Sequence, residues 1–133
     1  MIPPFNESGF LPPGVHPATL AEIRERFGGS SEIRRAQMDS IGWLIDLATR
    51  AGVQRIVLNG SFVTDIIEPN DVDCVLLIGP GPAKDSVAEE ELVQGVPFLD
   101  ISLVGPKDFD YFVNRFFAVD RRQRSKGMIE VVL

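Results

Sequence analysis

The sequence predicts one domain in which helices and strands alternate, of the α/β or α+β class. The chain has 133 residues and a hydrophobic fraction of 44%, which is enough for one core without disulfide bonds. Short apolar runs typical of strands alternate with longer segments whose apolar residues recur at helical spacing. We therefore expect residues 1–133 to form a single domain. Residues 1–17 are predicted to be an extended lead-in, because "LPPGVHP" is rich in proline and glycine.

Four segments are predicted to be helices: residues 18–29, 30–52, 86–95 and 107–120. The second carries the strongest signal, because a continuous apolar stripe runs along one face, Ser30 or Ser31 can cap its start, and Gly52 follows its end. The third is a modest helix for which we predict Ser86 as the cap. The fourth is amphipathic and rich in aromatic residues.

Four runs are predicted to be strands: residues 53–60, 71–78, 96–104 and 127–133. Side chains alternate across a strand, so alternate residues of the second run are expected on one face. The apolar set, predicted to face the core, comprises Val72, Cys74, Leu76 and Ile78.

Composition excludes several kinds of site. Cys74 is the only cysteine and His16 the only histidine, which excludes an internal disulfide, cysteine-rich zinc sites and multi-histidine metal sites. A Ser-His-Asp triad is disfavoured for the same reason. No apolar run approaches the length of a membrane span, and the first ten residues lack the pattern of a signal peptide. We expect a cytoplasmic protein without a membrane segment.

The net charge of −6 is unevenly distributed along the chain. Residues 115–126 contain five basic residues and one acid, a local charge of +4, whereas the other residues sum to −10. An acidic body disfavours binding along nucleic acid, while a local basic patch suits an anionic ligand such as a nucleotide phosphate. We assign Lys126 to such a phosphate. The alternative for this patch is a solvated charged turn.

Three acids stand beside apolar runs. Asp71 and Asp73 are two residues apart at the start of a predicted strand, so both side chains should lie on one face. Asp100 is the only charged residue within the run "VPFLDISLV". Clustered carboxylates repel one another unless a cation lies between them, and Mg²⁺ is a hard cation that binds carboxylate and phosphate oxygens together. We predict a divalent metal site at these three residues.

A Gly-Ser step precedes the acids. Gly60 ends a predicted strand where the chain must turn sharply, and glycine permits both this turn and the close approach of a ligand. The N–H groups that follow open a helical turn, which is a favourable position for an anion. Ser61 and Thr64 can add hydroxyl donors. The sequence therefore predicts a phosphate-binding turn at Gly60, Ser61 and Thr64.

The stretch "LNGSFVT…PNDVDCVLL", with "FLDIS" downstream, resembles the nucleotidyltransferase fold of the DNA polymerase beta superfamily. That signature is a Gly-Ser step, then D-x-D, then a third acid on a neighbouring strand, and here nine residues separate Ser61 from Asp71. Over nearly its whole length, the chain resembles a prokaryotic family of small nucleotidyltransferase-like proteins of unknown function. The resemblance implies an α+β nucleotidyltransferase fold, with a mixed sheet of about four strands flanked by helices.

The resemblance also implies roles for individual residues. Asp71 and Asp73 match the paired metal-binding aspartates, and Asp100 matches the third acid, which helps to activate the attacking hydroxyl. Gly60 and Ser61 match the phosphate-binding step. Lys126 has no counterpart in the signature, and its assignment comes from the basic patch alone.

Three functions are compatible with these features. The first is an enzyme dependent on Mg²⁺ (or Mn²⁺) that transfers a nucleoside monophosphate from a nucleoside triphosphate such as ATP to a hydroxyl. In its short length, the chain resembles the minimal antitoxin nucleotidyltransferases, which modify a partner protein. The second is a catalytically silent scaffold that binds nucleotide or partner. Binding of nucleic acid is the third and is disfavoured by the acidic body.

Overall fold

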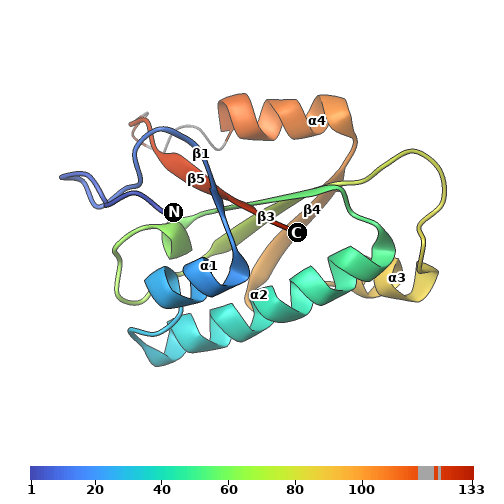
Figure 1. Ribbon diagram of the computed structural model, residues 1–133, viewed down its shortest axis with the longest axis horizontal. Helices are drawn as coiled ribbons and strands as arrows, with labels where there is room; N and C mark the ends of the chain where they lie inside the picture. The colour runs from blue at the N-terminus through green and yellow to red at the C-terminus, as the bar shows by residue number, and fades with distance from the viewer. Residues whose placement is uncertain (117–121, 123) are drawn as a thin grey trace.

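The computed structural model describes residues 1–116, 122 and 124–133, with only the backbone at position 116. In chain order the elements are β1 (Gly14–Ala18), α1 (Leu20–Phe27), α2 (Glu32–Ala51), β2 (Arg55–Asn59), a short 3₁₀ turn (Ser61–Val63), β3 (Val72–Leu77), α3 (Ser86–Gln94), β4 (Leu99–Val104), α4 (Pro106–Tyr111), a π-helical turn (Phe112–Phe116) and β5 (Gly127–Val131). They form an α+β fold around one mixed sheet, as Figure 1 shows.

The sheet has five strands in the order β1-β5-β2-β3-β4. Parallel pairs at its two edges, β1 with β5 and β3 with β4, flank antiparallel pairs of β2 with β5 and of β2 with β3. The α+β class is confirmed, but the expectation of about four strands is wrong by one.

The additional strand comes from the segment predicted to be a lead-in. Residues of β1 pair in register with β5, from Gly14 opposite Gly127 to Ala18 opposite Val131. Pro17 lacks the N–H that a central strand needs, and β1 tolerates it because an edge strand leaves one side unpaired. Proline content therefore indicated an edge strand here and not the absence of a strand.

Helices cover the sheet unequally. Helices α1, α2 and α3 pack on one face, which holds the larger core, and α4 lies across the other (Figure 1). Alternate β3 residues divide between these faces as predicted, since Val72, Cys74 and Leu76 belong to the larger core. Ile78 lies beyond the end of β3 and is exposed, which corrects its expected burial. Within the described residues, no helix combines the length and apolarity that a membrane crossing would need.

The ends of α2 follow the sequence prediction. The Ser31 hydroxyl accepts a hydrogen bond from the Arg34 N–H, which makes Ser31 the N-cap, and Gly52 ends the helix in the left-handed conformation at φ 84°. Helix α3 is capped differently from the prediction. Its N-cap is Asp85 and not Ser86, because Asp85 lies one residue earlier in an extended conformation.

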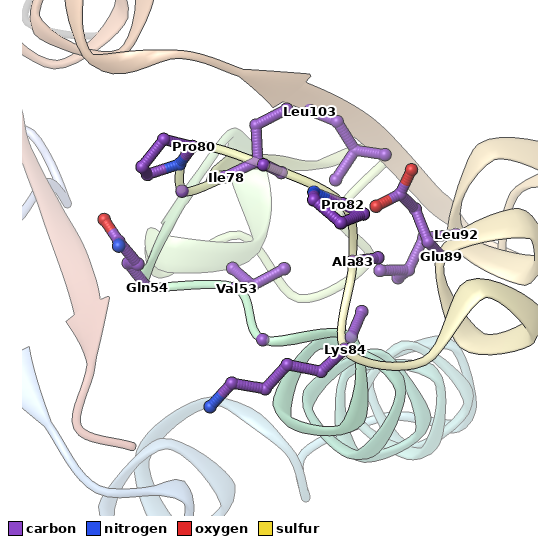
Figure 2. Close-up of a pocket in the computed structure, with 14 residues that line it drawn as sticks. Val53, Gln54, Ile78, Pro80, Pro82, Ala83, Lys84, Glu89, Leu92 and Leu103 are labelled. Atoms are coloured by element: carbon purple, nitrogen blue, oxygen red, sulfur yellow. The ribbon is translucent and has the colours of Figure 1, made fainter.

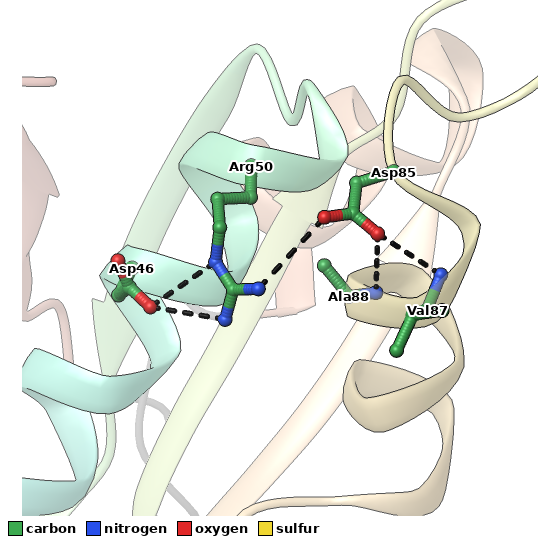
Figure 3. A network of polar contacts seen from close by, with 5 residues as sticks. All are labelled: Asp46, Arg50, Asp85, Val87 and Ala88. Atoms are coloured by element: carbon green, nitrogen blue, oxygen red, sulfur yellow. Dashed lines mark hydrogen bonds and ion pairs between the residues drawn. The ribbon is translucent and has the colours of Figure 1, made fainter.

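Asp85 also connects α3 to α2 through an exposed polar network, drawn in Figure 3. Its Oδ1 accepts from the N–H groups of Val87 and Ala88, both at 3.1 Å. Arg50 of α2 binds Asp46 at 3.1 Å and reaches Asp85 at 3.8 Å. Exposed pairs of this kind contribute little stability each, so the network orients α3 more than it stabilises it.

The helix predicted at residues 107–120 is α-helical only over Pro106–Tyr111 and continues as the π-helical turn; residues 117–120 lie outside the described part. Phe109 anchors α4 by burying its ring against the second core, which includes Val57 and Val75. The Arg55 guanidinium lies over that ring, 4.7 Å from its centroid. Helix α4 is thus fixed above the strands that carry the predicted acids.

Candidate functional site

Strand register brings polar residues of three strands into one row. Asp73 of β3 is paired with Asp100 of β4 in a parallel ladder and with Asn59 of β2 in an antiparallel one. Directly paired residues point to the same face, so the three side chains lie side by side. The face is that of α4, because Val75, two residues after Asp73, packs in the core beneath that helix. We call Asn59, Asp73 and Asp100 the polar row.

Asp71 lies immediately before β3 and extends the polar row. Its carboxylate interacts electrostatically with that of Asp73, and each of the two acids shifts the pKa of the other. Burial raises the pKa of Asp73 to about 6, and the neighbouring charges of Asp71 and Asp100 add to this effect. The acids therefore form one electrostatically coupled group.

Asp71 is held by the turn that precedes it. Ser61 Oγ donates to Asp71 Oδ1 at 2.5 Å, and the Ser61 N–H donates to the same oxygen at 3.2 Å. Burial alone would raise the pKa of Asp71, but these two donors from Ser61 lower it below its ordinary value. The two neighbouring aspartates thus have opposite pKa shifts, because Asp71 has the hydrogen-bond donors that keep it ionised.

Gly60 is required by this close contact. Its backbone has φ 89°, and a Cβ at this position would lie 2.7 Å from Asp71 Oδ2 and 2.9 Å from the Asp71 carbonyl oxygen. The Phe62 N–H donates to that same carbonyl oxygen at 3.1 Å. The turn predicted to bind phosphate therefore directs its first donors at Asp71.

Thr64 serves the backbone of the same loop. It is buried, its hydroxyl donates to the Ser61 carbonyl oxygen at 2.6 Å, and it accepts from the Ile66 N–H at 3.3 Å. The structure places Thr64 behind the turn and not beside the polar row.

Lys126 supplies positive charge to the acids. It immediately precedes β5, and its positive charge contributes to the lowered pKa of Asp71 and partly opposes the rise in the pKa of Asp73. Elsewhere in the basic patch, Arg124 lies over the Phe10 ring at 4.9 Å from its centroid. The predicted patch also includes residue 121, which lies outside the described part.

The acids match a divalent metal site in ligand type and face, but not in side-chain orientation. In the described part of the chain, no three His, Cys, Asp or Glu side chains are gathered closely enough to hold an ion. Asp71 is turned toward Ser61, and Asp100 is exposed. The residues therefore fit a hard cation once Asp71 leaves Ser61.

A cavity of about 250 Å³ lies away from the acids (Figure 2). It is lined by residues from the end of α2, the segment after β3 and helix α3, among them Val53, Pro82 and Leu92. Because β3 has six residues, this end lies roughly 20 Å from Asp71. The cavity does not belong to the candidate site.

Sequence reasoning missed two buried residues near the site. Asn59 falls within the predicted strand 53–60 but was given no role, although its pairing with Asp73 places it in the polar row. Arg34 is 3% exposed and contacts the loop between Ser61 and Asp71. Its position three and seven residues before Gln37 and Ile41 lies on the buried face of α2, and this spacing was the available signal.

Comparison with known proteins identifies a family without assigning an activity. The family described as a family of unknown function (DUF6932) matches residues 3–132 of the chain. No curated protein and no solved structure matches the chain.

Proposed function

We propose that this chain, which belongs to the DUF6932 family, is a magnesium-dependent nucleotidyltransferase with a nucleotidyltransferase-like fold. The observation that carries the proposal is the pairing of Asp73 with Asp100, with Asp71 two residues away and electrostatically coupled to Asp73. Three coupled carboxylates with one nearby ammonium are costly for an isolated domain and suit a cation–triphosphate ligand.

The reaction assigns a role to each acid. A hydroxyl oxygen of the acceptor attacks the α-phosphorus of a nucleoside triphosphate, the bond from that phosphorus to the bridging oxygen breaks, and pyrophosphate leaves. Asp100, which is exposed, accepts the hydroxyl proton. Asp71, Asp73 and Asp100 would hold Mg²⁺ or Mn²⁺, which stabilises charge on the attacking and leaving oxygens.

The triphosphate would lie on the other side of Asp71. Ser61 and the N–H groups after Gly60 are the donors closest to the acids, and Lys126 adds a positive charge nearby. These donors are directed at Asp71 in the structure, so binding requires Asp71 to exchange its Ser61 contact for the cation. Thr64 contributes by fixing the Ser61 carbonyl.

A partner protein is the acceptor that we propose. The described elements are used in one sheet and its covering helices, and the acids lie at a partly exposed edge of that sheet. A second protein that brings its own Ser, Thr or Tyr hydroxyl would complete the acceptor side, as in an antitoxin that modifies its toxin.

Transfer can be tested directly. The protein is incubated with each of the four labelled nucleoside triphosphates, with Mg²⁺ or Mn²⁺, and with protein and small hydroxyl acceptors. The matched control is the double variant Asp71→Asn, Asp73→Asn. We expect label transfer and release of pyrophosphate from the natural chain only. The proposal fails if no acceptor is labelled and no triphosphate binds.

One observation favours a second function, a catalytically silent scaffold of the same fold. The Gly60–Ser61 turn is satisfied by Asp71, so the structure is internally complete at this point without a ligand. The double variant separates the two functions. Stability should rise in either case through relief of carboxylate repulsion, so the deciding measurements are nucleotidyl transfer by the natural chain and partner binding by the double variant. A scaffold would retain its partner, whether or not it binds nucleotide, and show no transfer.

A further inference from the structure

A buried arginine binds the loop that leads to the acids. Arg34 lies in the first turn of α2 with 3% of its surface exposed. Its Nη1 donates to the carbonyl oxygens of Phe27 at 3.1 Å and Phe62 at 2.8 Å. Its Nη2 donates to Thr64 and Ile66 at 2.8 and 2.5 Å, and its Nε donates to Ile66 at 3.0 Å. All five N–H groups of the guanidinium are therefore used.

These five hydrogen bonds all end on main-chain carbonyl oxygens. A guanidinium buried in this way is desolvated, which lowers the pKa of Arg34, while the nearby charge of Asp65 opposes the shift. Its charge is further balanced by the Phe62 ring, whose centroid lies 5.3 Å from the guanidinium carbon. Lysine has three donors on one atom and cannot reach the same carbonyl groups with this geometry.

The carbonyl groups bound by Arg34 belong mainly to residues 62–66, between the Gly60–Ser61 turn and Asp71. Two other α2 residues continue the attachment. Ser31 donates to the Ile67 carbonyl oxygen at 2.8 Å, and Gln37 donates to that of Pro69 at 2.9 Å. The loop backbone is thus tied to the start of α2 along most of its length.

The loop ends by binding the site itself. The N–H groups of Asn70 and Asp71 donate to Ser61 Oγ at 3.0 and 3.2 Å. The same hydroxyl donates to the Asp71 carboxylate. A change in the path of residues 62–66 would therefore separate the two ends that meet at Ser61.

We propose that Arg34 is a positioning residue that fixes the 62–66 loop, so that Ser61 and Asp71 are presented beside Asp73 and Asp100. The expected effect of Arg34 on metal binding rests on the proposed function. The expected effect of Arg34 on the loop does not depend on that function. Arg34 touches no acid of the site and acts through the loop backbone.

Two variants of neighbouring arginines test this role. Arg34→Lys keeps the charge but loses donors, and Arg35→Lys is the matched control, because Arg35 is exposed and makes one carbonyl contact, to Gly29 at 3.2 Å. Amide hydrogen exchange is followed at Asn70 and Asp71 and, as an internal reference, across α3 and β4. Mn²⁺ affinity is measured by water-proton relaxation, with the metal alone.

We expect Arg34→Lys to lose about tenfold or more of the protection at positions 70 and 71, with protection in α3 and β4 retained. Mn²⁺ affinity should fall by a similar factor, and Arg35→Lys should change neither quantity. Unchanged exchange at 70 and 71, or an equal loss across the whole sheet, would overturn the positioning role. If the natural chain binds no Mn²⁺, the proposed function fails, and the exchange data still decide the role of Arg34.

The natural chain supplies a second measurement that needs no variant. If Arg34 holds the loop, its Nε–H and the amides of Asn70 and Asp71 should exchange through one opening event. Their exchange rates should then share one dependence on denaturant, distinct from that of β4. Separate dependences would overturn the proposal, even if Arg34→Lys failed to fold.

Discussion

Charged side chains are arranged in opposite ways at the two ends of the sheet face that α4 covers. At one end, Arg55 of β2 binds Glu130 of β5 through two hydrogen bonds of 2.8 and 2.6 Å. At the other end, Asp71, Asp73 and Asp100 stand together, and burial with mutual repulsion raises the pKa of Asp73. Both ends belong to the same sheet, so the difference is not one of fold.

The paired end, which holds Arg55 and Glu130, is an example of a charge with a structural role alone. Arg55 is placed between the Glu130 carboxylate and the Phe109 ring, and its pKa is raised chiefly by the hydrogen bond with Glu130. At the acidic end, the ammonium that acts on the carboxylates within the described residues is that of Lys126. A clustered charge left incompletely balanced is typical of a site that receives its counterion from a ligand.

The largest expected effect is a difference in nucleotidyl-transfer activity between variants at the two ends. Asp73→Ala removes the central carboxylate and should lower nucleotidyl transfer by about 1,000-fold or more, because charge on the transferring phosphoryl group loses its stabilisation. Glu130→Gln, at the paired end, should leave the rate within about twofold. Label transfer under saturating Mg²⁺ measures both. Equal losses in the two variants would mean that the ends do not differ in function.

The next effect concerns the tight contact at Gly60. Gly60→Ala should destabilise the domain by about 2 to 4 kcal/mol, because a methyl group would press on Asp71 at a backbone angle of φ 89°. Gly81→Ala is the matched control, with φ 86° and no atom within 4 Å of the added carbon, and should cost about 1 kcal/mol. Urea denaturation measures both. Equal losses would show that backbone strain, and not contact with Asp71, is the cause.

The acidic end should also show itself in the pH dependence of stability. The folded pKa of Asp73, about 6, lies above its ordinary value of 3.8, so the folded state binds the proton more tightly than the unfolded state. The free energy of unfolding should therefore fall as pH rises from about 4 to 6, by on the order of 2 kcal/mol, and level off above. Asp73→Asn should remove this fall.

Asp46→Asn provides the control for that measurement, since Asp46 is an exposed carboxylate already paired with Arg50. Denaturation is measured between pH 4 and 8 without divalent ions. A fall of the same size in Asp73→Asn would assign the pH dependence to other groups.

The smallest expected effect is a change in stability at pH 7, and its sign differs between the paired end and the acidic end. Glu130→Gln removes half of an ion pair that is partly exposed and should cost about 1 kcal/mol at pH 7, whereas Asp73→Asn should stabilise at the same pH. Urea denaturation of both variants, side by side, measures the contrast. Stabilisation by Glu130→Gln as well would show that the Arg55 pair is not favourable and would weaken the comparison.

Strands and helices were predictable where the periodicity of apolar residues in a segment agrees with the contacts that the segment makes in the fold. The alternation of Val72, Cys74 and Leu76 gave the inner face of β3, and Gly52 marked the end of α2 through its left-handed backbone. Strand β1 was not predicted, because the local proline signal competes with edge pairing to β5, which is a long-range contact. The cap at Asp85 differs from the predicted Ser86 by one residue, the usual uncertainty of helix ends.

The candidate site was accessible from the sequence only in part. That Asp71 and Asp73 share a face follows from strand alternation, whereas the pairing of Asp73 with Asp100 needs the order and register of two strands. The contact of Ser61 with Asp71 depends on the path of a loop, and that path depends on Arg34 more than twenty residues earlier. Contacts between residues so far apart in the sequence leave no local pattern from which they could be predicted.

The position of β5 has a consequence for how the sheet assembles. β1 contacts the rest of the sheet only through β5, and β5 lies between β1 and β2. Residues at opposite ends of the described chain must therefore meet before the first strand can dock, and closing so long a loop is entropically costly. The β2–β3–β4 half, which carries the acids, can form without waiting for that event, so we expect this half of the sheet to form first.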